Sequence, residues 1–188
     1  MNLARRKATY EDLLKVPDIL IAEIVDGELI TSPRPASPPA RAASVIRVDV
    51  DPFDRRLGGP GGPGGWWILF KPELHLGADI LVPDLAGWRR ERMPVLENVA
   101  YFEQAPDWVC EVVSPSTGRL DCVRKMPVYA RERVSHLWLV DPLQRTLEVY
   151  RLEGQRWVVV STHGEVEAVH AEPFEAIEIE MSRWWLEP

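Results

Sequence analysis

Three residues of this chain have the types and the spacing of a hydrolytic metal centre. Asp84 ends an apolar stretch, Glu111 interrupts the apolar run 107–113, and Lys125 follows in the next predicted element. Carboxylates at the edges of buried strands are costly unless something pairs with them. A divalent cation is the commonest partner of Asp and Glu when no His or Cys ligand lies nearby. The set therefore predicts Mg²⁺ or Mn²⁺ held by Asp84 and Glu111.

Phosphodiester hydrolysis is the chemistry that such a set would serve. It requires a metal at the scissile phosphate, a deprotonated water and neutralisation of the charge that develops in the transition state. Strand alternation places Val113 on the same face as Glu111, so the position next to Glu111 on this face has an apolar side chain and no amine. We therefore expect Lys125 to supply the positive charge, by orienting the attacking water or by stabilising the developing anion.

The elements that must position these residues alternate between strands and helices. Asp26-Gly27 between two apolar runs predicts a two-residue hairpin turn. Pro127 within the predicted helix 121–133 indicates a late start or a bend there. The mixed order favours an α/β (α+β) fold with one central sheet. Helices are expected at 10–14, 40–50 and 121–133, and strands at 21–25, 28–30, 66–69, 73–76, 80–82, 85–88, 107–113, 136–140, 147–152 and 157–161.

Length and composition favour one domain over residues 1–188, with the strands after 146 as a C-terminal extension. The segment 58–65 contains six Gly and two Pro and can only be a loop. It lacks the Lys-Ser/Thr ending of a phosphate-binding loop, so we interpret it as a flexible surface loop. Pro-rich residues 33–39 are expected to form a second loop. Cys110 and Cys122 have no zinc-ligand spacing and are expected to be buried free thiols.

The net charge of −7 argues against a broad nucleic-acid surface, although Arg89, Arg90 and Arg92 form a local basic cluster. No run of residues approaches the length of a transmembrane helix, and the first residues lack an apolar signal core. We therefore expect a cytoplasmic protein with no membrane partner, and a local groove for DNA remains compatible with the charge distribution.

An ordered set of motifs runs along most of the chain: Glu23-Ile24-Val25-Asp26-Gly27-Glu28-Leu29, Val82-Pro83-Asp84-Leu85-Ala86, Glu111-Val112-Val113-Ser114-Pro115-Ser116-Thr117, Lys125, Tyr129-Ala130 and Leu137-Trp138-Leu139-Val140-Asp141-Pro142. Together these motifs resemble the Uma2 family, a branch of the PD-(D/E)XK nuclease superfamily. The resemblance implies a restriction-endonuclease-like core, a central mixed β-sheet flanked by helices, and a Mg²⁺-dependent endonuclease acting on DNA. It implies that Asp84 and Glu111 are metal ligands, that Lys125 is a catalytic lysine displaced onto the following helix, and that Glu23 matches an acidic position near the site.

Two positions depart from the family pattern. Pro39 stands where such sequences often place a histidine, and Lys71 stands where an acidic residue is common. A catalytically silent relative that binds DNA or a protein partner is therefore the main alternative to an active nuclease. If the chain cuts both strands of a duplex, a homodimer with two symmetric sites is favoured.

Other interpretations of the same residues stay open at this point. Asp84 can simply end a strand and cap a turn, and Glu111 can pair with an arginine in a structural ion pair. Glu23 can be an exposed strand residue. A glycoside hydrolase would use Asp84 and Glu111 as acid and nucleophile, with some of the eight tryptophans as sugar platforms.

Overall fold

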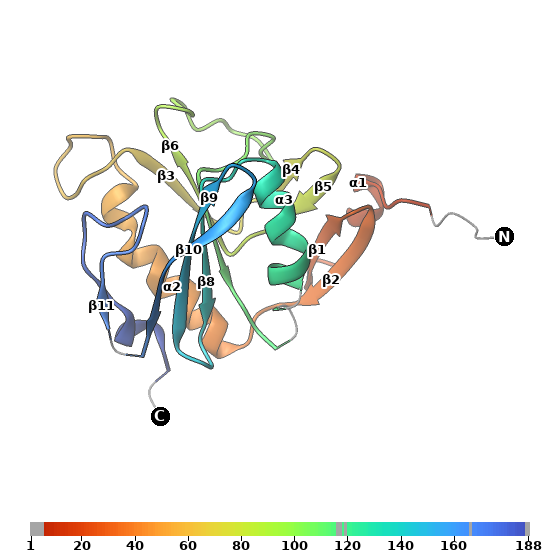
Figure 1. Cartoon of the computed structure of the whole chain (residues 1–188). Coiled ribbons are helices and arrows are strands. Elements are labelled where there is room, and N and C mark those ends of the chain that lie inside the picture. The colour runs from red at the N-terminus through yellow and green to blue at the C-terminus, as the bar shows by residue number, and fades with distance from the viewer. Residues whose placement is uncertain (1–5, 116–117, 119, 166, 187–188) are drawn as a thin grey trace.

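Two main β-sheets organise the structure, a computed structural model that describes residues 6–115, 118, 120–165 and 167–186 (Figure 1). The larger sheet has six strands in the order β10-β9-β8-β7-β6-β3, and the smaller has four in the order β2-β1-β5-β4. The small sheet contains β1 (Leu20–Val25), β2 (Glu28–Pro33), β4 (Leu74–Leu76) and β5 (Asp79–Leu81). The large sheet contains β3 (Trp66–Phe70), β6 (Leu85–Arg89), β7 (Trp108–Val112), β8 (His136–Asp141), β9 (Thr146–Glu153) and β10 (Arg156–Gly164). A short pair, β11 (Ala168–Val169) and β12 (Ile179–Glu180), lies near the C-terminus.

The large sheet is mixed, as the sequence predicts. Strands β7 and β8 pair in parallel, and every other neighbouring pair in this sheet is antiparallel. Strand β7 lies in the interior of the sheet, between β6 and β8. This position explains the continuous apolar run 107–113, because a central strand is buried on both faces.

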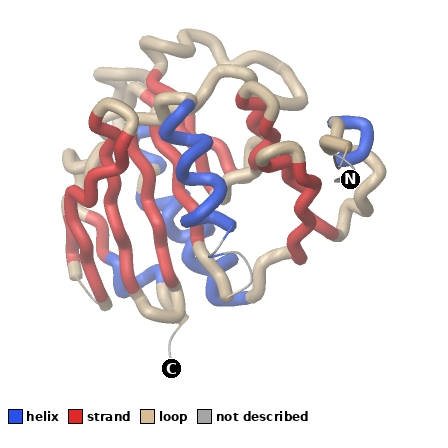
Figure 2. The backbone as a smooth tube through the Cα atoms, turned by 45° about the vertical axis from the view of Figure 1, so that its right-hand side comes forward, coloured by secondary structure: helices blue, strands red, loops and turns tan. Residues whose placement is uncertain are grey.

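The small sheet is separate, whereas the sequence favoured one central sheet. Asp26 (φ 55°) and Gly27 (φ 77°) form the predicted hairpin turn between β1 and β2 with the two positive φ angles of a type I′ turn. The chain leaves the small sheet after β5 and enters the large sheet at β6. Pro83 lies between these strands and cannot donate to a ladder, so the break falls there. Figure 2 shows the two groups of strands side by side.

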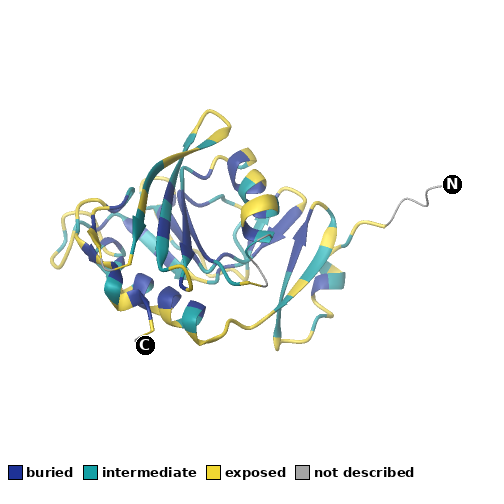
Figure 3. Cartoon of the chain, turned by 60° about the horizontal axis from the view of Figure 1, so that its bottom comes forward, coloured by how far each residue is buried: buried dark blue, intermediate teal, exposed yellow. Residues whose placement is uncertain are grey.

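Helices cover both faces of the large sheet. Helix α2 (Ser37–Asp49) lies on one face and α3 (Met126–Arg131) on the other, whereas α1 (Tyr10–Leu13) packs against the small sheet through Leu13. The shorter helical segments are η1 (Asp51–Phe53), η2 (Leu120–Lys125) and η3 (Met181–Trp184). Alternation along β7 directs Trp108 and Cys110 into the core beneath α2, and Val109 into the core beneath α3. Glu111 therefore lies on the α3 side. In Figure 3, α2 shows buried residues toward the sheet and exposed residues away from it. The expected fold class, a mixed sheet flanked by helices, is confirmed.

The helices differ from their predicted bounds at prolines. Helix α2 begins within the expected Pro-rich loop, because proline is tolerated in the first turn of a helix. The predicted helix 121–133 divides into a π-helical segment, η2, followed by α3. Pro127 has no N–H to donate within the ladder, and the wider turn upstream accommodates this loss. Cys110 is a buried free thiol as expected, whereas Cys122, on η2, is exposed. Within the described part of the chain, no helix combines the length and the apolar character needed to cross a membrane.

The C-terminal end of the Gly/Pro loop 58–65 has a defined conformation. Gly64 N donates to Pro52 O at 3.0 Å, and Gly65 N donates to Arg55 O at 2.7 Å. Gly64 has φ +68°, and a Cβ there would lie 2.4 Å from the carbonyl oxygen of Arg56. Gly58 has the similar φ of +72°, but a Cβ there would meet nothing within 4 Å. Replacing each glycine with alanine therefore distinguishes two costs: the left-handed backbone conformation, which both positions share, and the steric clash, which occurs at Gly64 and not at Gly58.

We expect Gly64→Ala to lower the free energy of unfolding by about 3 kcal/mol, and Gly58→Ala by about 1 kcal/mol. Both variants hold an alanine in the unfavourable left-handed conformation, but only Gly64→Ala also forces the carbonyl of Arg56 to move. Urea denaturation of both variants measures the difference. Equal losses in the free energy of unfolding would show that the backbone at the end of the loop moves easily to relieve the clash, as the Gly- and Pro-rich composition alone suggests.

Candidate active site

The predicted site residues meet at the junction of the two sheets. Asp84 lies at the crossing between β5 and β6, and the next residue, Leu85, pairs with Cys110 of β7. Glu111 follows Cys110 on β7, so the two carboxylates belong to adjacent chain segments. A cavity of about 270 Å³ collects the ionisable side chains Glu23, Lys71, Asp84, Glu111, Asp121 and Lys125. All four residues predicted from the sequence are therefore brought together.

Lys125 lies at the centre of three carboxylates. Its Nζ lies 2.9 Å from Glu23 Oε1, 2.9 Å from Glu111 Oε1 and 3.2 Å from Asp121 Oδ1. An ammonium group has three N–H donors, so these contacts match its full capacity. Lys125 is 2% exposed, and its three partners are also buried. The structural ion pair considered for Glu111 thus exists, but with a lysine rather than an arginine.

Two further hydrogen bonds fix the carboxylates around Lys125. Tyr129, on α3, donates its hydroxyl to Glu111 Oε1 at 2.6 Å. The Val82 amide donates to Glu23 Oε1 at 2.8 Å. Glu23 therefore ties β1 to the crossing segment that carries Asp84. The interpretation of Glu23 as an exposed strand residue is wrong, because its side chain is buried in this network.

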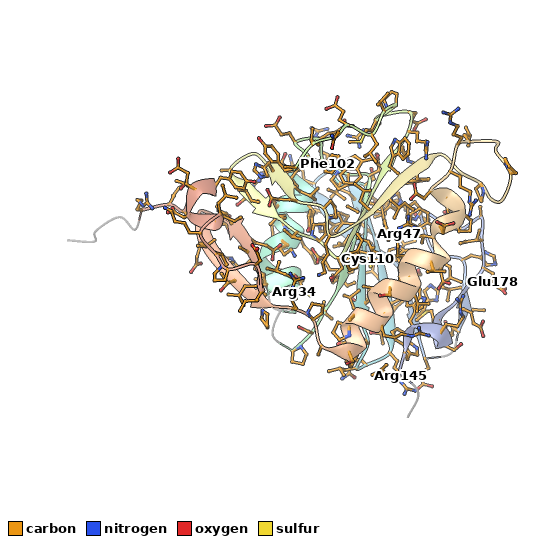
Figure 4. All side chains as sticks on the ribbon, turned by 180° about the vertical axis from the view of Figure 1, so that it is seen from behind. Arg34, Arg47, Phe102, Cys110, Arg145 and Glu178 are labelled. Atoms are coloured by element: carbon orange, nitrogen blue, oxygen red, sulfur yellow. The ribbon has the colours of Figure 1, made fainter. Side chains whose placement is uncertain are left out.

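Asp84 is held by both of its carboxylate oxygens. Oδ1 accepts from Lys71 Nζ at 2.7 Å, and Oδ2 accepts from the Val112 amide at 2.8 Å. Its side chain is 15% exposed, more than the deeper carboxylates, and it lines the same cavity. Arg34 also lines this cavity, and Figure 4 shows it where the hairpin leads into α2, with Cys110 inside the large sheet.

Excess negative charge dominates the electrostatics of the cluster. Burial raises the pKa of Glu111 well above its usual range, and the neighbouring carboxylates add to this against the opposing effect of Lys125. Burial alone would lower the pKa of Lys125, but Glu111 and Glu23 outweigh it and the pKa rises well above its usual value. Burial, followed by the charge of Glu111, also raises the pKa of Tyr129. All three pKa shifts have the same direction, so each of these groups keeps its proton to a higher pH than the isolated side chain would.

Three members of the site received no role in the sequence analysis. Asp121 and Tyr129 each lie four residues from Lys125, a spacing that places helical side chains on one face. That spacing is a signal that could have identified them. Lys71 was noted only as a departure from the family pattern, and no local signal predicts its contact with Asp84. Pro39, the other departure, lines the cavity.

The donor set suits a hard divalent cation bound mainly by water. Across the residues that the structure describes, no three His, Cys, Asp or Glu side chains converge to hold a metal ion by themselves. Mg²⁺ usually keeps several waters and takes only one or two carboxylates from the protein. Asp84 and Glu111 line one cavity from adjacent segments and meet that smaller requirement.

Comparisons with known proteins identify a family and a similar fold. Residues 8–182 match the model of a family, Uma2, that is described as "Putative restriction endonuclease". The fold is similar to a crystal structure described as "a putative nuclease belonging to DUF820" from Anabaena variabilis ATCC 29413. That pair has a TM-score of 0.70 and 23% sequence identity, over 94% of this chain and 97% of the other. No curated protein matches the chain.

Proposed function

The chain belongs to the Uma2 family, and we propose that it is a metal-dependent endonuclease that hydrolyses phosphodiester bonds in DNA. One observation carries the proposal. Carboxylates from both sheets and from η2 converge with Lys125 in one cavity that has excess negative charge. Active sites are where buried like charges concentrate, whereas a merely structural ion pair needs one carboxylate for each lysine.

In this proposal Asp84 and Glu111 hold Mg²⁺ or Mn²⁺. When bound, the metal would neutralise charge on the scissile phosphate and lower the pKa of a bound water. Tyr129 fixes Glu111 through its hydroxyl, and Glu23 fixes the crossing segment through the Val82 amide. The chain thus orients both ligands before substrate arrives, which limits the reorganisation needed during the reaction.

Lys125 has two roles in this proposal. It balances the buried carboxylates, and its ammonium lines the cavity where negative charge would develop on a phosphate. Its three donors face carboxylates in this structure, so contact with a phosphate requires that at least one of these contacts be given up.

A catalytically silent relative that binds DNA or a partner is the second candidate. The ion pair between Lys71 and Asp84 favours it, because one proposed metal ligand already has a cation. A glycoside hydrolase has less support, since no tryptophan is among the described residues that line the cavity.

Cleavage of supercoiled plasmid tests the proposal directly. We expect nicked and linear products with Mn²⁺ or Mg²⁺ and none with a chelator, because the metal is needed to neutralise the phosphate. Glu111→Gln, purified identically, controls for contaminating nuclease and should be inactive. Wild-type protein that cleaves no plasmid, single-stranded DNA or RNA with either metal would favour the silent relative. Light scattering with and without duplex would test for the homodimer that cutting both strands favours.

A further inference from the structure

We propose that Lys71 is an internal counter-cation of Asp84 that a divalent metal must displace, so that Lys71 sets how tightly the site binds metal. The inference rests on the proposed function, because it assigns Asp84 to the metal. Its basis is the 2.7 Å contact between Lys71 Nζ and Asp84 Oδ1 inside the cavity. The amide of Val112 takes Asp84 Oδ2, so the cation site on this carboxylate is the oxygen that Lys71 occupies.

The backbone holds Lys71 in this place. Lys71 has φ 47°, in the left-handed region that residues other than glycine seldom adopt. Its amide donates to Asp84 O at 3.0 Å, directly after the last pair of the β3–β6 ladder, Phe70 with Leu85. Lys71 therefore contacts Asp84 through both its backbone and its ammonium.

The two lysines of the cavity are not equivalent. Lys125 is buried and contacts three carboxylates, whereas the side chain of Lys71 is 20% exposed. Among the described residues, the Lys71 ammonium forms one ion pair, with Asp84, and lies 5.7 Å from the centre of the Phe70 ring. Moving Lys71 away costs one partly exposed ion pair, but moving Lys125 would leave three buried carboxylates uncompensated. Lys71 is therefore the cation that can leave.

The formal charge of the cluster supports the exchange. The cavity is lined by four carboxylates, those of Glu23, Asp84, Glu111 and Asp121, and by three cationic side chains, those of Lys71, Lys125 and Arg34, which leaves a formal charge of −1. Departure of the Lys71 ammonium would bring this charge to −2, which one divalent cation balances. A metal on Asp84 would repel the neighbouring ammonium and occupy its contact, so binding and the departure of Lys71 are coupled.

Removal of the Lys71 charge distinguishes this role from simple positioning. If Lys71 competes with the metal, Lys71→Met should tighten Mn²⁺ binding by about tenfold or more, since a cation no longer opposes the metal. If Lys71 only holds Asp84 in place, the same variant should weaken binding. Methionine keeps the Cβ and therefore the same backbone demand at φ 47°.

Isothermal titration with Mn²⁺ on the full chain measures the affinity without any nuclease assay. Lys71→Arg, which retains the charge, should stay close to wild type. Lys15→Met is the control for net charge, because Lys15 is an exposed lysine whose ion pair with Asp12, at 3.7 Å, lies outside the cavity. It should change the affinity by less than about twofold, the scale expected for a screened surface charge.

Equal or weaker Mn²⁺ binding in Lys71→Met would overturn the inference, and the proposed function would stand as long as wild type binds Mn²⁺. Binding in Lys71→Met but not in wild type would support the inference in its strongest form. Absence of binding in both proteins would overturn the inference and the proposed function together. Thermal melts of each variant without metal identify any variant that fails to fold, and Lys71→Gln then replaces Lys71→Met.

Discussion

Lys125→Met is expected to lower the free energy of unfolding by about 3–5 kcal/mol, the cost of breaking a buried ion pair from one side. The variant leaves Glu23, Glu111 and Asp121 buried without their shared cation. Methionine has nearly the length of lysine, so the loss reports on charge rather than on a cavity. Urea denaturation at neutral pH measures it, because the raised pKa of Lys125 keeps the wild-type ammonium protonated there.

Lys15→Met is the matched control for this measurement. Lys15 pairs with Asp12 at 3.7 Å and its side chain is 74% exposed, so its loss should change stability by less than about 0.5 kcal/mol. Adding Glu111→Gln to Lys125→Met should recover part of the stability, since one uncompensated charge disappears. A loss below about 1 kcal/mol in Lys125→Met would contradict the cluster described here and would mean that the carboxylates do not depend on this cation.

Asp84→Asn is expected to lower the rate of metal-dependent cleavage by on the order of a thousandfold, because the amide removes the negative charge that holds the cation. The substitution preserves the shape of the side chain and an oxygen that can accept from the Val112 amide. Stability without metal should therefore change by about 1 kcal/mol or less. Single-turnover cleavage of a labelled duplex in excess enzyme measures the rate, and a melting series with Mn²⁺ shows whether the metal-induced stabilisation is also lost.

Asp79→Asn is the control for Asp84→Asn, because the two aspartates have similar hydrogen-bond partners. Asp79 accepts from the Asp26 amide at 2.6 Å and from Arg131 at 2.8 Å, so it also combines one backbone donor with one cationic side chain. Asp79 is buried but does not line the cavity. Its substitution should leave the cleavage rate unchanged below the melting temperature. Equal loss of cleavage in both variants would indicate a folding defect, and a wild-type rate in Asp84→Asn would remove Asp84 from the site.

The sequence by itself determined the elements with local signals. Asp26-Gly27 predicted the β1–β2 hairpin because a type I′ turn requires two residues that tolerate positive φ. The apolar run around Glu111 predicted a central strand, and a carboxylate within that run predicted a partner for it. Pro127 predicted the disturbance of the helix that the structure resolves as η2 followed by α3.

Only the tertiary structure decided which groups share the site. Glu23, Asp84 and Glu111 lie far apart in the sequence, and their meeting depends on how two sheets join at Pro83. Neither hydrophobic periodicity nor turn chemistry specifies pairing between remote segments, because both report only on neighbours along the chain. For the same reason the contact of Lys71 with Asp84 became visible only when β3 paired with β6. The residue types and local patterns of the sequence therefore determined which kinds of chemistry are available, but long-range packing determined which charged groups contact one another.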